Sequence, residues 1–298
     1  MTRLFARVAV VAASAALALG LGACSGSPAP TTSSPAPQQS ASPQPSTEPS
    51  GPAVADLTFT PGKLTIATGN PAYSPWVEND APESGEGFEA AVAYAVADKL
   101  GFAHADVVWV RTTFEESTVA GPKEWDMNIQ QFSITEERKQ AVDFSSPYYT
   151  TAQAVLTYPG SPLAGATTLA ELREGRLGAM IGTTSLTAIN EQIAPTTPAE
   201  IYNSNADTAQ ALKNKQIDAI VVDLPTALYL AAVEIDGGIV IGQLADSAGG
   251  DQFGILLPKG SALTAPVTEA VDALAADGTL AALEQQWLSE SISVPVLS

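Results

Sequence analysis

Histidine and cysteine are almost absent from this 298-residue chain, which contains one of each, His104 and Cys24. One cysteine cannot form a disulfide within the chain, and the two residues cannot supply the ligands of a Cys/His zinc site. A Ser-His-Asp or Cys-His catalytic group would have to use the single histidine, which lies in a turn predicted at the surface. We therefore expect no enzyme of these classes, no metal site and no cofactor.

Positive charge is also scarce, because 13 Lys and Arg side chains face 32 Asp and Glu side chains, for a formal net charge of -19. Proteins that bind nucleic acids hold phosphates with Lys and Arg, so a strongly acidic chain has the wrong sign for that task. Apolar residues make up 45% of the chain, enough for one large or two modest cores. The composition predicts a folded protein and excludes nucleic acid as a partner.

The apolar run at the N-terminus is too short for a transmembrane helix. Residues 8–22 form a run of about 15 residues after Arg3 and Arg7, whereas a helix that spans a bilayer needs ~20. This pattern is typical of a signal peptide. The run ends in LGAC, which resembles the lipobox cut by lipoprotein signal peptidase, so we expect removal of residues 1–23 and a lipid on Cys24. The alternative is an ordinary secretory peptide with an incidental buried cysteine.

Large apolar side chains are almost missing from residues 25–56. This segment has eight Pro and eight Ser among 32 residues, so nothing in it offsets the entropy lost on ordering. Its proline content makes it extended and semi-rigid. We expect residues 24–56 to tether the folded part to the extracytoplasmic face of the cell membrane through the lipid on Cys24. A mucin-like or wall-embedded segment is the alternative.

From about Leu57 the sequence alternates short β-rich runs with helical patterns, which is typical of α/β layers. The rhythm occurs twice, and about 240 residues suit two lobes with a cleft between them. We assign residues 57–150 and 249–298 to lobe 1 and residues 151–248 to lobe 2. The chain would then cross between the lobes twice, which predicts a hinge. The expected strands are at 63–68, 107–110, 177–181, 218–222 and 253–258, and the expected helices are at 89–100, 185–193, 207–215, 226–234, 261–276 and 280–288.

The run SITEER at residues 133–138, followed by DFSSPY at 143–148, is the most informative stretch. It resembles the signature of extracytoplasmic solute-binding proteins of family 3, the polar amino-acid group of ABC transporters. Further similar features follow in the family's order over about residues 62–290, and several ordered matches are far less expected by chance than one. They are the runs at 70–76, 87–89, 182–184, 218–223 and 253–255.

The resemblance implies a type II periplasmic-binding-protein-like fold, with two α/β lobes, a ligand cleft between them and a two-strand hinge. It also implies a monomeric, non-enzymatic receptor that captures a free amino acid and delivers it to the subunits of an ABC permease. Two alternatives stay open. One is an enzyme similar to cyclohexadienyl dehydratase, for which Glu89 is a conceivable general acid. The other is a lipoprotein that senses an amino acid or contacts the cell wall.

An amino acid carries a carboxylate and an ammonium, and enclosing both is costly unless each meets a fixed partner. The planar guanidinium of Arg138 could accept the carboxylate; otherwise Arg138 is a surface residue at a helix start. Asp223 ends the apolar run 219–222, at the strand end where clefts of open α/β sheets lie. Its position suits equally an ammonium partner or a cap for the helix near Pro225. The resemblance assigns it to the ammonium.

Further ligand contacts are implied by position in the family motifs. Ser133 would offer its hydroxyl and backbone N–H, and Gln131 would contribute backbone contacts. In the second lobe, Thr183 and Thr184 open a helix whose free N–H groups could hold the ligand carboxylate. The alternative is that Thr184 or Ser185 merely caps this helix.

Selectivity is indicated by Asn70, which stands where many relatives with cationic ligands have Asp. The missing negative charge favours a neutral polar amino acid. Tyr73, Trp76 and Phe114 could form apolar walls, although aromatic side chains lie more often in the core. A more polar or smaller pocket is also expected, because two glutamines replace small residues at one strand end: Gln130 and Gln131.

Overall fold

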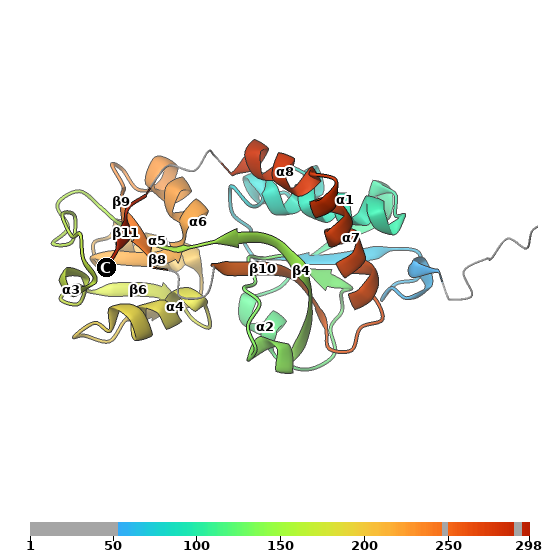
Figure 1. The fold of residues 1–298 in the computed structure, drawn as a ribbon, viewed down its shortest axis with the longest axis horizontal. Coiled ribbons are helices and arrows are strands. Elements are labelled where there is room, and N and C mark those ends of the chain that lie inside the picture. The colour runs from blue at the N-terminus through green and yellow to red at the C-terminus, as the bar shows by residue number, and fades with distance from the viewer. Residues whose placement is uncertain (1–52, 246–249, 289–293) are drawn as a thin grey trace, which may run out of the picture. The chain divides into compact units, whose positions relative to one another are not determined.

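Two separate β-sheets organise the computed structural model, which describes residues 53–245, 250–288 and 294–298 (Figure 1). The expected signal peptide, the lipid on Cys24 and almost all of the expected tether lie outside the described residues. Within the described ranges, no helix has both the length and the apolar character needed to cross a membrane. The residues from Gly51 to Ser298 belong to one compact unit.

The first sheet has the strand order β2-β1-β3-β10-β4, with β1 parallel to its neighbours and β10 antiparallel to its own. Both faces of β1 are buried, because Leu64 and Ile66 pack under the helices and Ala67 packs in a second cluster. This explains its continuous apolar character. The strands are β1 (Leu64–Thr68), β2 (Val107–Arg111), β3 (Met127–Asn128), β4 (Val142–Thr151) and β10 (Asp251–Pro258).

Three helices pack together against one face of the first sheet (Figure 1). They contribute Phe88, Val92 and Val271 to a core that also contains Phe253 of β10. These helices are α1 (Phe88–Leu100), α7 (Thr264–Ala276) and α8 (Thr279–Trp287); the short α2 (Phe114–Thr118) packs with the cluster on the other face. Single turns lie at η1 (Val54–Asp56), η2 (Glu78–Asp80), η3 (Pro82–Ser84), η4 (His104–Asp106) and η5 (Arg138–Gln140).

The second sheet has the strand order β11-β9-β5-β8-β6-β7. Alternate residues of β8 enter different cores, since Ala219 and Val221 belong to one cluster and Ile220 and Val222 to the other. The strands are β5 (Gln153–Thr157), β6 (Leu177–Met180), β7 (Glu200–Tyr202), β8 (Ala219–Asp223), β9 (Ile239–Leu244) and β11 (Val296–Leu297). The helices are α3 (Leu169–Leu172), α4 (Thr184–Ala188), α5 (Asn205–Lys213) and α6 (Leu224–Tyr229), with π-helical turns η6 (Ile189–Ile193) and η7 (Leu230–Glu234).

The C-terminal end of the chain corrects one expectation. Residues 249–298 were expected to belong to lobe 1, but β11 pairs in parallel with β9 of the second sheet, and Leu297 is buried in that core. The chain therefore passes between the sheets a third time, after α8. β11 lies very close to β9 at Gly242, where a Cβ would stand only 2.6 Å from Cγ of Leu297. Glycine at this position leaves space for β11.

Each sheet contains an aspartate that binds the start of a neighbouring strand. Asp126 donates its N–H to the carbonyl of Thr65 at 2.9 Å and accepts the N–H of Thr65 with Oδ2 at 2.7 Å. Asp218 makes the same pair of contacts with Arg176, at 2.7 and 2.9 Å. In both sheets this aspartate follows an apolar residue and directly precedes a buried strand, so the two sheets share one structural device.

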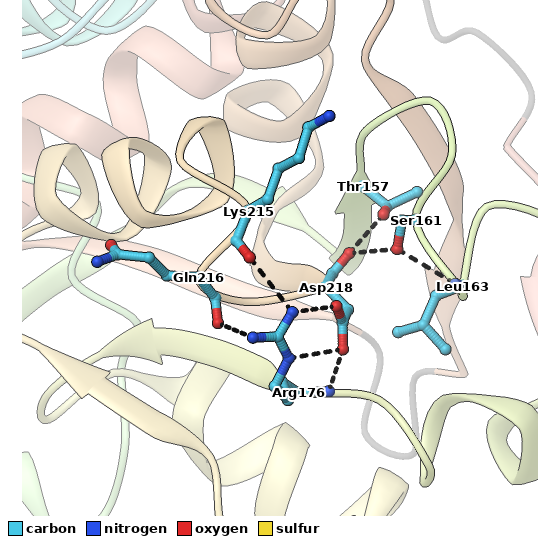
Figure 2. Close-up of polar contacts among 7 residues, drawn as sticks. All are labelled: Thr157, Ser161, Leu163, Arg176, Lys215, Gln216 and Asp218. Atoms are coloured by element: carbon cyan, nitrogen blue, oxygen red, sulfur yellow. Dashed lines mark hydrogen bonds and ion pairs between the residues drawn. The ribbon is translucent and has the colours of Figure 1, made fainter.

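Asp218 also accepts bonds from the Arg176 guanidinium (Figure 2). Its side chain is only 8% exposed, and the shortest nitrogen-to-oxygen distance in the ion pair is 2.7 Å. These bonds hold the pKa of Asp218 below its usual value. Figure 2 also shows that the Asp218 carbonyl accepts the hydroxyls of Thr157 and Ser161. The segments before β6 and β8 and after β5 are joined at this residue.

We expect Asp218→Ala to lower the free energy of unfolding by about 2–3 kcal/mol, because the partly buried backbone N–H of Arg176 and its guanidinium lose their common acceptor. The measurement is urea unfolding at pH 7. Because the folded pKa lies below the unfolded one, the contribution of Asp218 is present above pH ~4 and is lost as pH falls through its folded pKa. Glu136→Ala is the matched control, because Glu136 forms an ion pair with Lys139 but its own side chain is 89% exposed. A similar loss in both variants would contradict the prediction.

Candidate functional site

The C-terminal ends of the parallel strands of both sheets lead into loops that meet around one cavity. In the first sheet, β1 leads to Asn70 and Tyr73, and β3 leads to Gln130 and Gln131. In the second sheet, β8 ends at Asp223. Strand carboxyl ends are where α/β sheets usually bind ligands, because the loops there diverge from the sheet. The location of the cavity therefore follows from the strand order.

The cavity has a volume of about 80 Å³. At roughly 10–15 Å³ per water, it has room for on the order of six waters. All nine predicted ligand-binding residues line it, although their contact with a ligand stays a prediction. They are Asn70, Tyr73, Phe114, Gln131, Ser133, Arg138, Thr183, Thr184 and Asp223.

Arg138 reaches from η5 of the first lobe towards the second. Its Nη1 donates to the carbonyl of Ser133 at 2.7 Å, and its Nη2 donates to the carbonyl of Gly182 at 2.9 Å. Its Cζ lies 5.1 Å from the centre of the Phe114 ring. Burial lowers the pKa of the guanidinium, and nearby carboxylates oppose that shift. Among the described residues Arg138 forms no ion pair, so its charge is available to an anion.

Asp223 occupies the N-cap position of α6, but its side chain makes no capping bond. Instead, its Oδ1 accepts the side-chain amide of Gln153 at 2.8 Å. Burial, and then the carboxylate of Asp251, raises the pKa of Asp223 to about 7. The capping alternative is thus not used, and a carboxylate that is costly to ionise faces the cavity.

The threonines of the second lobe have different roles. Thr183 caps α4, because its Oγ1 accepts the N–H of Leu186 at 3.2 Å. The cap was expected at Thr184 or Ser185, so that alternative is wrong by one position. The Thr184 hydroxyl lies 3.2 Å from the hydroxyl of Ser133 and donates to Asp251 at 2.7 Å. Hydroxyls from both lobes therefore meet beside the cavity.

Gln131 has a left-handed backbone, with φ of 49°, and a buried carboxylate holds it there. Glu89, which is 0% exposed, accepts the Gln131 N–H at 2.7 Å and also accepts the Gln131 side-chain amide and the Tyr148 hydroxyl. Burial raises the pKa of Glu89 to about 7, and these bonds oppose part of that rise. Glu89 does not line the cavity, so its position supports a structural role and gives no support to a general acid.

An ion pair supports the loop that carries Asn70 and Tyr73. Arg111 donates to the carbonyl of Gly69 at 2.8 Å and to Asp80 at 2.6 Å. The same Asp80 oxygen accepts the N–H of Ala72 at 2.9 Å. These contacts fix the loop between the strand end and the cavity.

For Trp76 the sequence left two roles open, a wall of the pocket or a place in the core, and the structure shows the core. Trp76 is 0% exposed, does not line the cavity, and packs edge-on against Phe88 and Tyr149 in the first core. Its Nε1 donates to the Thr226 hydroxyl at 2.9 Å, so it connects the lobes outside the cavity. Phe114 does line the cavity, stacked on Phe132 at 4.7 Å.

Sequence reasoning missed several residues at the site. Residues 203–205 line the cavity from the loop between β7 and α5, where no motif marks them. Gln153 and Asp251 begin β5 and β10, the strands that follow two of the three passages between the sheets, and both bind residues that line the cavity. The sequence did not mark these two residues as part of the site, because only the fold brings them close to each other and to the cavity. In the described ranges, no group of three or more His, Cys, Asp or Glu could hold a metal ion.

This chain is similar in sequence to proteins that are named as amino-acid-binding proteins. The probable histidine-binding protein of Campylobacter jejuni subsp. jejuni serotype O:2 is 32% identical over 170 residues, 55% of this chain and 62% of that protein, which is less than two thirds of its length. The ABC transporter glutamine-binding protein GlnH of Bacillus subtilis (strain 168) is 29% identical over 213 residues, 70% of this chain and 76% of that protein.

A solved structure has the same fold. The structure of an ancestral arginine-binding protein bound to glutamine matches with a TM-score of 0.64 and 28% identity. The match covers 77% of this chain and 99% of that protein. The predicted two-lobed type II fold is thereby confirmed. Residues 64–290 match the family described as bacterial extracellular solute-binding proteins, family 3. This match covers most of the chain and includes both sheets, so the chain belongs to the bacterial extracellular solute-binding proteins of family 3.

Proposed function

We propose that this protein is the substrate-binding component of an ABC importer, which captures a free α-amino acid between its lobes and delivers it to the permease. The observation that carries the proposal is the presence of Arg138 and Asp223 at one cavity, on different lobes. Neither forms an ion pair with another described residue. A zwitterion would satisfy both charges at once, so its binding would stabilise the closed arrangement of the lobes.

The ligand we propose is a neutral polar amino acid. Asn70 and Gln130 line the cavity with amides, which carry no net charge. The Oε1 atom of Gln130 is buried and has no hydrogen-bond partner among the described residues. A buried acceptor is costly until it meets a donor, and a ligand side chain with N–H groups would supply one. Two relatives are named as a probable histidine-binding protein and a glutamine-binding protein, and both of these amino acids have side-chain N–H groups.

A thermal-shift screen of the twenty amino acids tests this proposal. A ligand that binds only the folded state must raise the melting temperature. We expect the amides glutamine and asparagine to raise it more than lysine, arginine or glutamate. No shift with any amino acid at millimolar concentration would contradict capture of an amino acid, whereas a shift with arginine alone would contradict only the neutral class.

We expect Asn70→Asp to increase the ratio of arginine affinity to glutamine affinity by roughly tenfold or more, since one charge pair in a partly buried site is worth on the order of 1.4 kcal/mol or more. Calorimetric titration of both ligands measures the ratio. Asn214→Asp adds the same charge at an exposed residue of α5's end, away from the cavity. An equal change in both variants would show that net charge, not position 70, sets the preference.

We further propose that the protein acts as a monomer on the extracytoplasmic face of the cell membrane, held by a lipid on Cys24. The N-terminal sequence supports this location through its charged start, short apolar run and LGAC ending. Release of a Cys24→Ser protein from the membrane fraction is the test of the anchor, and retention in that fraction would contradict it.

A further inference from the structure

Two polar side chains lie beside the ligand cavity, on strands that follow the crossings between the sheets. Gln153 is the first residue of β5, and Asp251 is the first residue of β10. Asp251 pairs with Thr151, the last residue of β4, and Gln153 follows two residues later in the chain. The segment that leads from β4 into β5 therefore lies beside the start of β10. Gln153 is 7% exposed. Neither residue lines the cavity or belongs to the motifs described above.

Their side chains hold three residues of the second lobe. The Gln153 amide nitrogen donates to Asp223 at 2.8 Å and to Asp251 at 2.5 Å, and its oxygen accepts the Ser185 hydroxyl at 2.6 Å. The same Asp251 oxygen accepts the Thr184 hydroxyl at 2.7 Å. The groups proposed to hold the ligand's ammonium and carboxylate are therefore fixed by residues on the crossing strands.

The carboxylates of Asp223 and Asp251 both accept hydrogen bonds from the side-chain amide nitrogen of Gln153. Burial disfavours the charged form of Asp223 most, and the carboxylate of Asp251 disfavours it further. Glu89 acts on Asp223 in the same direction, whereas the cation Arg138 acts in the opposite direction. Two further titratable groups among the described residues interact with Asp223, the phenols of Tyr148 and Tyr149.

We propose that Gln153 and Asp251 are positioning residues of the ligand site, and that Asp251 makes capture of the ligand's ammonium release a proton from Asp223. This rests on the proposed function. In the ligand-free protein near neutral pH, part of the Asp223 population holds a proton. The incoming ammonium stabilises the carboxylate, the Asp223 O–H bond breaks, and the proton passes to the solvent. The product is an ion pair between the Asp223 carboxylate and the ammonium.

The test is calorimetric titration of the full chain between pH 5.5 and 8, with L-glutamine, L-histidine and L-arginine as probes, because all three share the α-amino group. In the wild type we expect affinity to rise up to tenfold per pH unit below pH 7 and then to level off. Titrations in two buffers of different ionisation enthalpy should show proton release near pH 6. Absence of proton release would overturn the proposal in the unaltered protein.

Asp251→Asn is the decisive variant, because it removes the charge and keeps the shape. We expect the midpoint of its pH profile to fall by roughly one unit, and its affinity at pH 6 to exceed that of the wild type severalfold. Glu137→Gln removes an exposed carboxylate that also acts on Arg138 and should leave the midpoint unchanged. An unchanged midpoint in Asp251→Asn would overturn the coupling while leaving amino-acid binding intact.

Gln153→Met tests positioning separately. We expect its affinity to fall at least tenfold at every pH, since Asp223 and Ser185 lose their common partner. Wild-type affinity in this variant would overturn the positioning role. Failure of all three probes to bind the wild type would instead overturn the proposed function.

Discussion

Arg138→Met is expected to lower the affinity for the bound amino acid by roughly a hundredfold or more. Removing one partner of a buried, hydrogen-bonded charge pair costs about 2–5 kcal/mol, because the other charge is left enclosed without compensation. In the proposed complex, the charge left behind is the ligand's carboxylate. In the described part of the chain, Arg138 is the only Lys or Arg that lines the cavity, so no other cation there can take its place.

The fold should survive this substitution. The Arg138 guanidinium is partly desolvated and forms no ion pair among the described residues, so methionine removes an electrostatic cost and puts an apolar side chain beside the Phe114 ring, over which Cζ of Arg138 lies. Arg173→Met is the matched control, because Arg173 also donates to a backbone carbonyl, that of Ile193 at 2.7 Å, but lies outside the cavity. Calorimetry measures both variants. Near-wild-type affinity in Arg138→Met, or an equal loss in Arg173→Met, would contradict the role of Arg138.

The two charges of the site could be predicted because the sequence offers few candidates. Arg138 sits in a run of hydroxyl residues after a strand, and Asp223 ends an apolar strand, where a carboxylate is exposed to a cleft. What position alone could not decide was whether Asp223 caps α6. The answer depends on Gln153, which is 70 residues away along the chain and draws the carboxylate from the helix.

The parts that sequence reasoning missed depend on long-range packing. β11 has two residues, too few for any periodic pattern, and its place is set by Leu297 and the space left at Gly242. An aromatic residue at position 76 suits a pocket wall as well as a core. Trp76 lies in the core because it packs against three aromatic rings there, those of Phe88, Tyr149 and Phe253. Asp251 acts on the site only because two crossing strands meet. Local patterns therefore predicted strand ends and charges but not the contacts behind them.

Asp223→Asn should reduce affinity roughly tenfold to a hundredfold, the range for losing a hydrogen bond to a charged group. The asparagine keeps an acceptor for the Gln153 amide, so the shape of the site is preserved and only the negative charge opposite the ammonium is lost. The pH dependence of affinity should disappear with it. Asp236→Asn, at an exposed aspartate of the same lobe, is the control for net charge. Unchanged affinity in Asp223→Asn would contradict the ammonium role.

The same variant should be more stable than the wild type without ligand. Because the pKa of Asp223 is raised to about 7 in the folded protein, the folded state binds more protons than the unfolded state between about pH 4 and 7. Wild-type stability from this group therefore falls as pH rises through that window, by at most about 4 kcal/mol. Asparagine has no such cost, so the difference in melting temperature between variant and wild type should grow from pH 5 to pH 8. A constant difference would mean that Asp223 ionises without penalty, which would contradict a carboxylate made costly to ionise by burial.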